Sequence, residues 1–286
     1  MWKKVLVIFT IVAIAITFFF YQTNNNITWL TKKCSQHDRP NYIDRFCQTT
    51  SDQTPKPSDT LPTSVPTNQP TVTITSSSPI LIPTQAPTQL PIPQYHLIKT
   101  TFIPQAPEKN WDQPWQDACE EAALLTSVYY FKNQSPDIAT IKQDILDLVD
   151  YQTQTGWLID INLSQMSQIA TNYYGLKANI LLNPTIDEIK TYISQDTPVL
   201  VPANGKILYR ENKHFKDGGP YYHAITILGY DDAKKQFIVH DVGTQHGAYF
   251  TYSYQTLMES IHDLPPSGDK HDINQGQSAV MVLKSV

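Results

Sequence analysis

Residues 222–241 read YHAITILGYDDAKKQFIVHD. The two ends of this stretch, 222–229 and 236–241, are rich in β-branched and aromatic residues and flank a short polar turn, a pattern that predicts an antiparallel hairpin. With a loop of three or four residues, facing residue numbers add up to about 464 or 465, which places Asp241 or its neighbour opposite His223. Because alternate side chains of a strand share a face, each of these two residues ends an apolar face, made by Ile225 and Ile227 in one strand and by Phe237 and Val239 in the other. The hairpin therefore predicts a histidine and an aspartate side by side.

Segments on both sides of the hairpin complete the pattern of one domain. A period of two predicts further strands at 199–203, 249–253 and 279–283. Helical spacing predicts four helices upstream: one opened by Cys119, one after the cap Ser135 and first-turn Pro136, one over 163–174 stopped by Gly175, and one after a capping box of Thr185 and Glu188. Helices followed by an antiparallel sheet describe an α+β domain, which we expect over residues 95–286.

Glycine and proline divide the chain unevenly. All 10 Gly lie at or after Gly156, whereas 10 of the 21 Pro fall between Pro55 and Pro93. The segment 49–94 is rich in Thr, Pro, Ser and Gln and cannot bury enough apolar surface to fold by itself. It is therefore expected to be a disordered, extended linker that acts as a spacer.

The N-terminus carries a candidate membrane anchor. Residues 5–21 are uncharged and follow Lys3 and Lys4. A run of about 17 residues is at the lower limit for a transmembrane helix, and the positive side stays cytoplasmic. We therefore expect residues 1–21 to be a single-pass signal anchor and the rest of the chain to be extracytoplasmic. The alternative is secretion after cleavage of a signal peptide, although no Ala-x-Ala cleavage site follows the run.

The short segment 22–48 holds two of the three cysteines, Cys34 and Cys47. On this topology both lie outside the membrane, where oxidising conditions permit a disulfide. We predict a structural disulfide between them; two free thiols are the alternative.

Composition and charge exclude several classes of protein. With 41% hydrophobic and 16% charged residues, the chain as a whole is not a disordered protein. Its net charge of −5 gives no electrostatic reason to expect nucleic-acid binding, and it contains no ATP-binding P-loop. Four histidines lack the spacing of metal ligands and are expected to be solvated on the surface: His214, His240, His246 and His262. No metal or cofactor is therefore expected.

The third cysteine, Cys119, stands at the predicted start of a helix. There the helix dipole stabilises a thiolate, and a protonated histidine lowers the thiol pKa further. An aspartate beside that histidine can hold its tautomer and stabilise the imidazolium. We therefore expect Cys119, His223 and Asp241 to form a nucleophile, base and orienting carboxylate. The alternatives are a buried small side chain, a core histidine and a turn residue.

Several separate sequence blocks resemble one known family. FIPQAP at 102–107 and DACEEAAL at 117–124 resemble the segment before the nucleophile and the nucleophile helix of bacterial peptidases related to the double-glycine-leader (bacteriocin-processing) peptidases. GPYYHA at 219–224, GYD at 229–231 and HDVGT at 240–244 resemble that family's His and Asp segments, in the same order. The resemblance implies a papain-like cysteine peptidase fold with a Cys-His-Asp triad.

The same resemblance implies a glutamine in an oxyanion hole. Gln105 matches the Pro-x-Gln pattern of the family, while Gln113 lies six residues before Cys119, a spacing common to relatives linked to exporters. Many relatives have Gly-Pro after the cysteine, where this chain has Glu120 and Glu121. Two carboxylates beside a thiol raise its pKa, which favours a slow or specialised enzyme.

Three functional hypotheses follow. The first is a membrane-anchored, extracytoplasmic cysteine peptidase that cleaves a peptide or protein through an acyl-enzyme. The second keeps the triad but transfers the acyl group to an amine, as in transglutaminase-like or transpeptidase-like enzymes. The third is an inactive surface binding module on the same fold.

Overall fold

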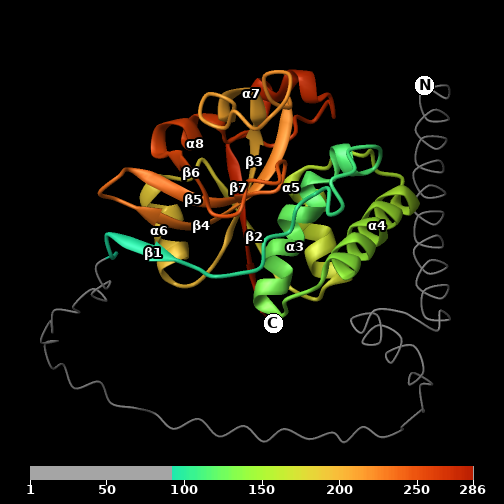
Figure 1. Ribbon diagram of the computed structural model, residues 1–286, viewed down its shortest axis with the longest axis horizontal. Helices are drawn as coiled ribbons and strands as arrows, with labels where there is room; N and C mark the ends of the chain where they lie inside the picture. The colour runs from blue at the N-terminus through green and yellow to red at the C-terminus, as the bar shows by residue number, and fades with distance from the viewer. Residues whose placement is uncertain (1–91, 286) are drawn as a thin grey trace, which may run out of the picture. The chain divides into compact units, whose positions relative to one another are not determined.

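The computed structural model describes residues 92–285 (Figure 1). The expected anchor over 1–21, the cysteine pair in 22–48 and nearly all of the linker over 49–94 lie outside these residues. Within residues 92–285, no helix combines the length and the apolar character needed to cross a bilayer.

A seven-stranded antiparallel sheet forms the centre of the domain. Six strands follow the order β2-β7-β3-β4-β5-β6, and β1 also pairs with β4. The strands are β1 (Tyr95–Leu97), β2 (Lys177–Leu182), β3 (Val199–Asn204), β4 (Tyr222–Asp231), β5 (Gln236–Asp241), β6 (Phe250–Ser253) and β7 (Ala279–Lys284). The five predicted strands are confirmed, with ends that differ by at most two residues. The short β1 and the half-exposed edge strand β2 were not predicted.

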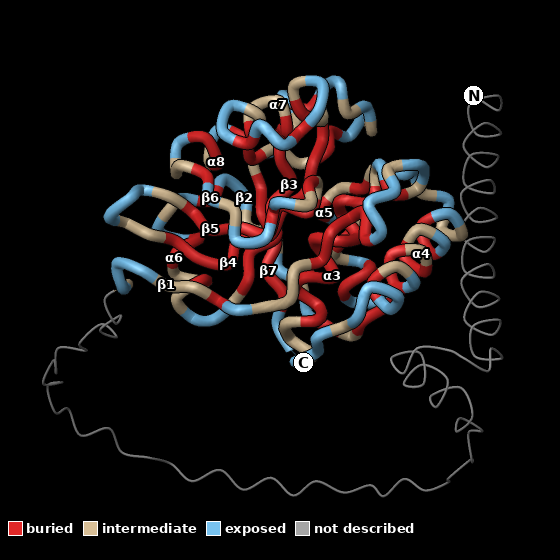
Figure 2. The backbone as a smooth tube through the Cα atoms, in the orientation of Figure 1, coloured by how far each residue is buried: buried red, intermediate tan, exposed pale blue. Residues whose placement is uncertain are grey.

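The helices surround this sheet, and one of them is internal. They are η1 (Trp115–Asp117), α3 (Cys119–Phe131), α4 (Ile138–Thr155), α5 (Leu163–Gln168), η2 (Ile169–Tyr173), α6 (Ile186–Ser194), α7 (Gly205–Leu208), α8 (Tyr254–Ser260) and η3 (Lys270–Gln275). Eleven of the 13 residues of α3 are buried, because α3 packs against both α4 and the sheet. Figure 2 shows this burial along α3, β3 and β4, whereas α4 keeps an exposed face.

Two helices differ from the sequence predictions. Asp137, not Ser135, caps α4, because its carboxylate accepts the N–H of Thr140 at 2.8 Å. The helix predicted over 163–174 is α5 followed by the π-helical turn η2, whose wider winding places Ile169, Ala170 and Tyr173 in the core. The predicted capping box of α6 is confirmed.

The register of the β4–β5 hairpin also differs from the prediction. Asp241 faces Ile225, two residues along β4 from His223, and His223 itself faces Ala203 of β3. The cause is the position of the turn: the ladder continues to the pair Asp231–Gln236, so facing numbers next to the four-residue loop add up to 467, and beyond the extra residue Leu228, a β-bulge, they add up to 466. Without this extra residue Asp241 would face an even-numbered position of β4 and would point to the opposite face from His223.

His240 is buried, contrary to its predicted place on the surface. It faces Thr226 across the hairpin, on the sheet face that α3 covers. The rings of Phe102 and Tyr249 lie edge-on to the His240 ring, at 5.2 and 4.6 Å between centroids. Neither ring nitrogen has a hydrogen-bond partner among residues 92–285, and burial lowers the pKa of His240 to about 4.

This depressed pKa predicts a specific loss of stability in acid. An unfolded histidine titrates near 6.5, so between pH 6.5 and 4 the unfolded chain binds the proton more readily than the folded chain. We expect His240 to remove up to roughly 3 kcal/mol of stability over this range. His240→Phe keeps a ring between Phe102 and Tyr249, so its free energy of unfolding in urea should fall less than that of the wild type between pH 7 and 4.5. Parallel pH dependences for the two chains would contradict the prediction.

Candidate functional site

Cys119 is the first residue of α3 and stands against the strand that carries His223. One helical turn later, the carbonyl of Ala123 accepts a hydrogen bond from Oγ1 of Thr226, three residues from His223 on β4, at 3.0 Å. This bond ties the start of α3 to β4. The thiol is only 5% exposed. Burial first, and then the neighbouring Glu120, raise the pKa of Cys119 well above its usual value, so in this structure they outweigh the lowering expected from the helix dipole.

His223 and Asp241 form a buried pair. Nε2 of His223 lies 2.9 Å from Oδ1 of Asp241, and both side chains are almost fully buried. Burial opposes ionisation of Asp241, but the charge of His223 and the hydrogen bonds that the carboxylate accepts hold its pKa below the usual value. Since Nε2 is engaged by Asp241, Nδ1 is the ring nitrogen left for a second partner.

The second oxygen of Asp241 has two further donors that sequence reasoning missed. The hydroxyl of Tyr252 lies 2.5 Å from Oδ2, and Nδ2 of Asn212 lies 2.9 Å from it. Asn212 also bonds the Tyr252 hydroxyl at 3.1 Å. Tyr252 fits the alternating pattern of an ordinary strand, and Asn212 lies in a polar loop. The local sequence around neither residue therefore indicates a bond to Asp241.

Two neighbours fix the plane of the His223 ring. Phe215 packs edge-on, with 5.3 Å between ring centroids. Gly243 comes so close to both rings that a Cβ on it would lie 2.6 Å from Cε1 of His223 and 2.9 Å from Cε1 of Phe215. A glycine at position 243 is therefore required by close approach to the imidazole.

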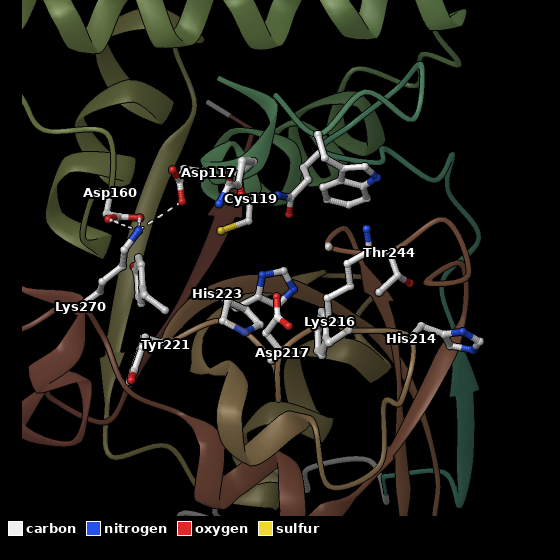
Figure 3. A pocket seen from close by; sticks show the side chains of 18 of the residues that line it. Asp117, Cys119, Asp160, His214, Lys216, Asp217, Tyr221, His223, Thr244 and Lys270 are labelled. Atoms are coloured by element: carbon white, nitrogen blue, oxygen red, sulfur yellow. Dashed lines mark hydrogen bonds and ion pairs between the residues drawn. The ribbon is translucent and has the colours of Figure 1, made fainter. Parts of the chain in front are cut away.

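Cys119 and His223 both line one cleft with a volume of about 670 Å³. In Figure 3 the two side chains lie between Asp160 and Lys270 on one side and Thr244 and His214 on the other. The cleft is also lined by Gln105, Trp111, Gln116, Asp117, Phe215, Lys216, Asp217, Gly219, Pro220, Tyr221, Tyr222, Gly243, Gln245 and His246. A cleft of this size admits an extended segment of a few residues.

The two candidate glutamines occupy different places. Gln105 is buried and lines the cleft with Cys119, and its Nε2 donates to the carbonyl oxygens of Trp115 and Gln116, each at 3.0 Å. Its Oε1 is buried without a partner among the described residues. Gln113 is exposed, donates to Asp117 at 2.6 Å and does not line the cleft. The structure thus places Gln105, and not Gln113, on the cleft that Cys119 lines.

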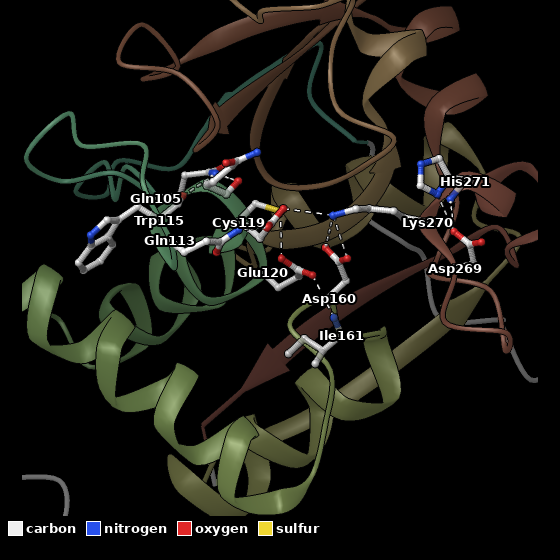
Figure 4. A network of polar contacts seen from close by, with 12 residues as sticks. Gln105, Gln113, Trp115, Cys119, Glu120, Asp160, Ile161, Asp269, Lys270 and His271 are labelled. Carbon is white, nitrogen blue, oxygen red and sulfur yellow. Dashed lines mark hydrogen bonds and ion pairs between the residues drawn. The ribbon is translucent and has the colours of Figure 1, made fainter.

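Glu120 and Glu121 point in different directions, although the sequence placed both beside the thiol. Oε2 of Glu120 lies 3.0 Å from Sγ of Cys119, and its Oε1 accepts the N–H of Ile161 at 3.0 Å (Figure 4). Glu121 turns away and accepts a hydrogen bond from Gln152. Burial raises the pKa of Glu121 to about 7.

A cluster of charges closes one end of the cleft. Nζ of Lys270 lies 3.2 Å from Asp117 and 3.1 Å from Asp160 (Figure 3). These residues come from η3, η1 and the loop before α5, far apart in the chain, which is why no local pattern predicted the cluster. At the other end His214 and His246 are exposed and stacked, with 4.4 Å between ring centroids. Among residues 92–285 no group of three or more His, Cys, Asp or Glu side chains is placed to hold a metal ion.

The chain is similar to known peptidases. Two solved structures are similar to the chain: a proposed C39-like peptidase from Bacillus anthracis (15% identity, 66% of this chain and 98% of that chain, TM-score 0.41) and xylellain, a cysteine protease from Xylella fastidiosa (14% identity, 68% and 87%, TM-score 0.38). No curated protein matches the sequence. Residues 91–261, more than half of the chain, match the Peptidase_C39 like family. The chain therefore belongs to this family of cysteine peptidases.

Proposed function

We propose that this chain cleaves peptide bonds by nucleophilic catalysis with Cys119, His223 and Asp241. The observation that carries the proposal is the buried, hydrogen-bonded His223–Asp241 pair on the same cleft as a cysteine at a helix N-terminus. A carboxylate held by three side chains is anionic and lowers the cost of forming an imidazolium beside it.

In the proposed reaction, Nδ1 of His223 takes the proton of the Cys119 thiol while Sγ attacks the scissile carbonyl carbon. The C–N bond then breaks, and the imidazolium gives its proton to the leaving amine. Water, deprotonated by His223, attacks the thioester and releases the carboxylate product and the free thiol. Asp241 keeps the ring in one tautomer and stays ionised throughout.

We propose that the oxyanion is held by the backbone N–H of Cys119, which lies in the first turn of α3, where backbone donors have no intrahelical acceptor. Gln105 is the proposed side-chain donor because it lines the cleft, whereas Gln113 does not. Both N–H groups of Gln105 serve the carbonyls of Trp115 and Gln116, so one of these bonds has to open when the oxyanion forms.

The test of this function combines turnover with thiol reactivity. The full-length chain should cut members of a peptide library, followed by mass spectrometry, and Cys119→Ala should cut none. Water as the acceptor yields free carboxyl ends, whereas products extended by an added amine would instead indicate acyl transfer. Binding of library peptides that is unchanged in Cys119→Ala, with no cleavage by either chain, would contradict an enzyme and indicate a binding module.

The close approach at Gly243 gives a second prediction. Because a Cβ at this position overlaps His223, Gly243→Ala should push the imidazole away from Asp241. A displacement of about 1 Å costs catalysis roughly 100-fold, so we expect turnover to fall by about that factor. The φ of Gly243 is not positive, so the backbone conformation accepts alanine, but the overlap with the His223 and Phe215 rings should cost about 1–3 kcal/mol of stability, and turnover is therefore compared on variant protein shown to be folded. Wild-type turnover in a folded variant would contradict the proposed role of His223.

We also propose that residues 1–21 anchor the enzyme in the membrane with its peptidase domain outside the cell. The support is the uncharged run 5–21 behind Lys3 and Lys4. A protease added to intact cells should release a soluble fragment that contains Cys119 by cutting within the linker 49–94. A chain that is protected until the cells are lysed would contradict this topology.

A further inference from the structure

Glu120 is a buried carboxyl group in contact with the proposed nucleophile. Its side chain has no measurable exposure. Oε1 accepts the backbone N–H of Ile161 at 3.0 Å, and this bond orients the carboxyl plane so that Oε2 reaches Sγ of Cys119, also at 3.0 Å (Figure 4). The reaction described above gives this contact no role.

The surroundings of Glu120 disfavour a negative charge. The titratable groups that face it are the thiol of Cys119 and Glu121 on α3, Asp160 in the loop before α5, and the phenol of Tyr222 on β4. Lys270, which pairs with this Asp160, is held by Asp117 and Asp160. Burial first, and then the charges of Glu121 and Asp160, raise the pKa of Glu120 well above its usual value. Glu120 accepts the N–H of Ile161 and the S–H of Cys119 but has no cation of its own, so burial favours its protonated form more than for an exposed carboxyl group.

A protonated Glu120 changes the polarity of its contact with Cys119. In the protonated form, Oε1 is engaged as an acceptor and the proton sits on Oε2. Among residues 92–285, the hydrogen-bond partner of Oε2 is Sγ of Cys119. A neutral carboxyl group can donate to a thiolate, and a donor stabilises the anionic form of its acceptor. The residue that departs from the common Gly-Pro pattern is thus able to help the nucleophile instead of opposing it.

We propose that Glu120 is a positioning residue with a built-in alkaline switch: its carboxyl group donates a hydrogen bond to the Cys119 thiolate while His223 is imidazolium, and it gives its proton to the sulfur when His223 becomes neutral. The inference rests on the proposed function, because it needs Cys119 to form an ion pair with His223. It deepens that function by stating how the same site is regulated by pH.

The proton balance is simple. In the active form the O–H proton is on Glu120, the sulfur is a thiolate and the imidazole carries two protons. Loss of the imidazolium proton removes the charge that stabilises the thiolate. The O–H bond of Glu120 then breaks and an S–H bond forms, because burial raises the pKa of the Cys119 thiol as well as that of Glu120, and a carboxyl group is the stronger acid of the two by about four pKa units before burial. No oxidation or reduction takes place.

The experiment measures alkylation of Cys119 by iodoacetamide as a function of pH, with Cys119 followed in its own peptide by mass spectrometry. In the wild-type chain we expect the rate to rise as the ion pair forms and then to fall by about tenfold or more at alkaline pH. Glu120→Gln keeps a donor to the thiolate but cannot release a proton, so its rate should rise and stay on a plateau. Glu121→Gln is the matched control: it removes the neighbouring carboxyl group, which does not touch the thiol, and should keep the alkaline fall.

The outcomes separate the two proposals. A wild-type rate that exceeds that of free cysteine at neutral pH, but rises to a plateau in alkali, overturns the role of Glu120 and leaves the triad standing. A thiol that reacts no faster than free cysteine at any pH overturns both. If Glu120→Gln does not fold, the wild-type profile still decides, because a Cys–His pair without the switch shows no alkaline fall.

Discussion

The buried carboxylate of Asp241 is the interaction on which the site depends. Removing a carboxylate from water costs several kcal/mol unless donors replace the lost solvent. Here the donors come from His223, Asn212 and Tyr252, together with the backbone N–H of Gly243 at 3.2 Å. These groups belong to β4, the loop after α7, β6 and the loop after β5. The charge is tolerated only when all four segments are in place, so the packing that stabilises Asp241 also aims the imidazole.

The surroundings of the two acidic side chains at the site, Asp241 and Glu120, therefore shift their ionisation in opposite directions. Hydrogen bonds and the charge of His223 hold the pKa of Asp241 below its usual value, whereas the equally buried Glu120 accepts only from Ile161 and Cys119 and has two acidic neighbours, which raise its pKa. In the proposed site, the first carboxyl group stabilises positive charge on the histidine and the second holds a proton next to the sulfur. The difference arises from the surroundings, because both residues are buried carboxylic acids close to the same cleft.

Sequence reasoning predicted the α+β fold, five strands and the hairpin that carries His223 and Asp241, because strand periodicity and turn composition are local properties. It missed the other donors to Asp241 and the Lys270 cluster, which form from segments distant in the chain. It could not tell that Glu120 meets the thiol while Glu121 turns away, because adjacent helix positions differ by 100° and only packing shows which one lies next to Cys119. The surface position predicted for His240 was wrong because the sequence alone does not show that α3 covers the sheet face on which His240 lies.

The bulge at Leu228 links the length of the hairpin to its chemistry. Facing residues point to the same side of the sheet. His223 and Asp241 therefore share a side only if the facing residue numbers on their part of the ladder add up to an even number. The extra residue of the bulge changes this sum from 467 to 466. Loss of that single residue would reverse the side of the sheet on which every later side chain of β5 lies, Asp241 included. During evolution the ladder of this hairpin can therefore change length only in pairs of residues, whereas the four-residue loop at its tip lies outside the constraint.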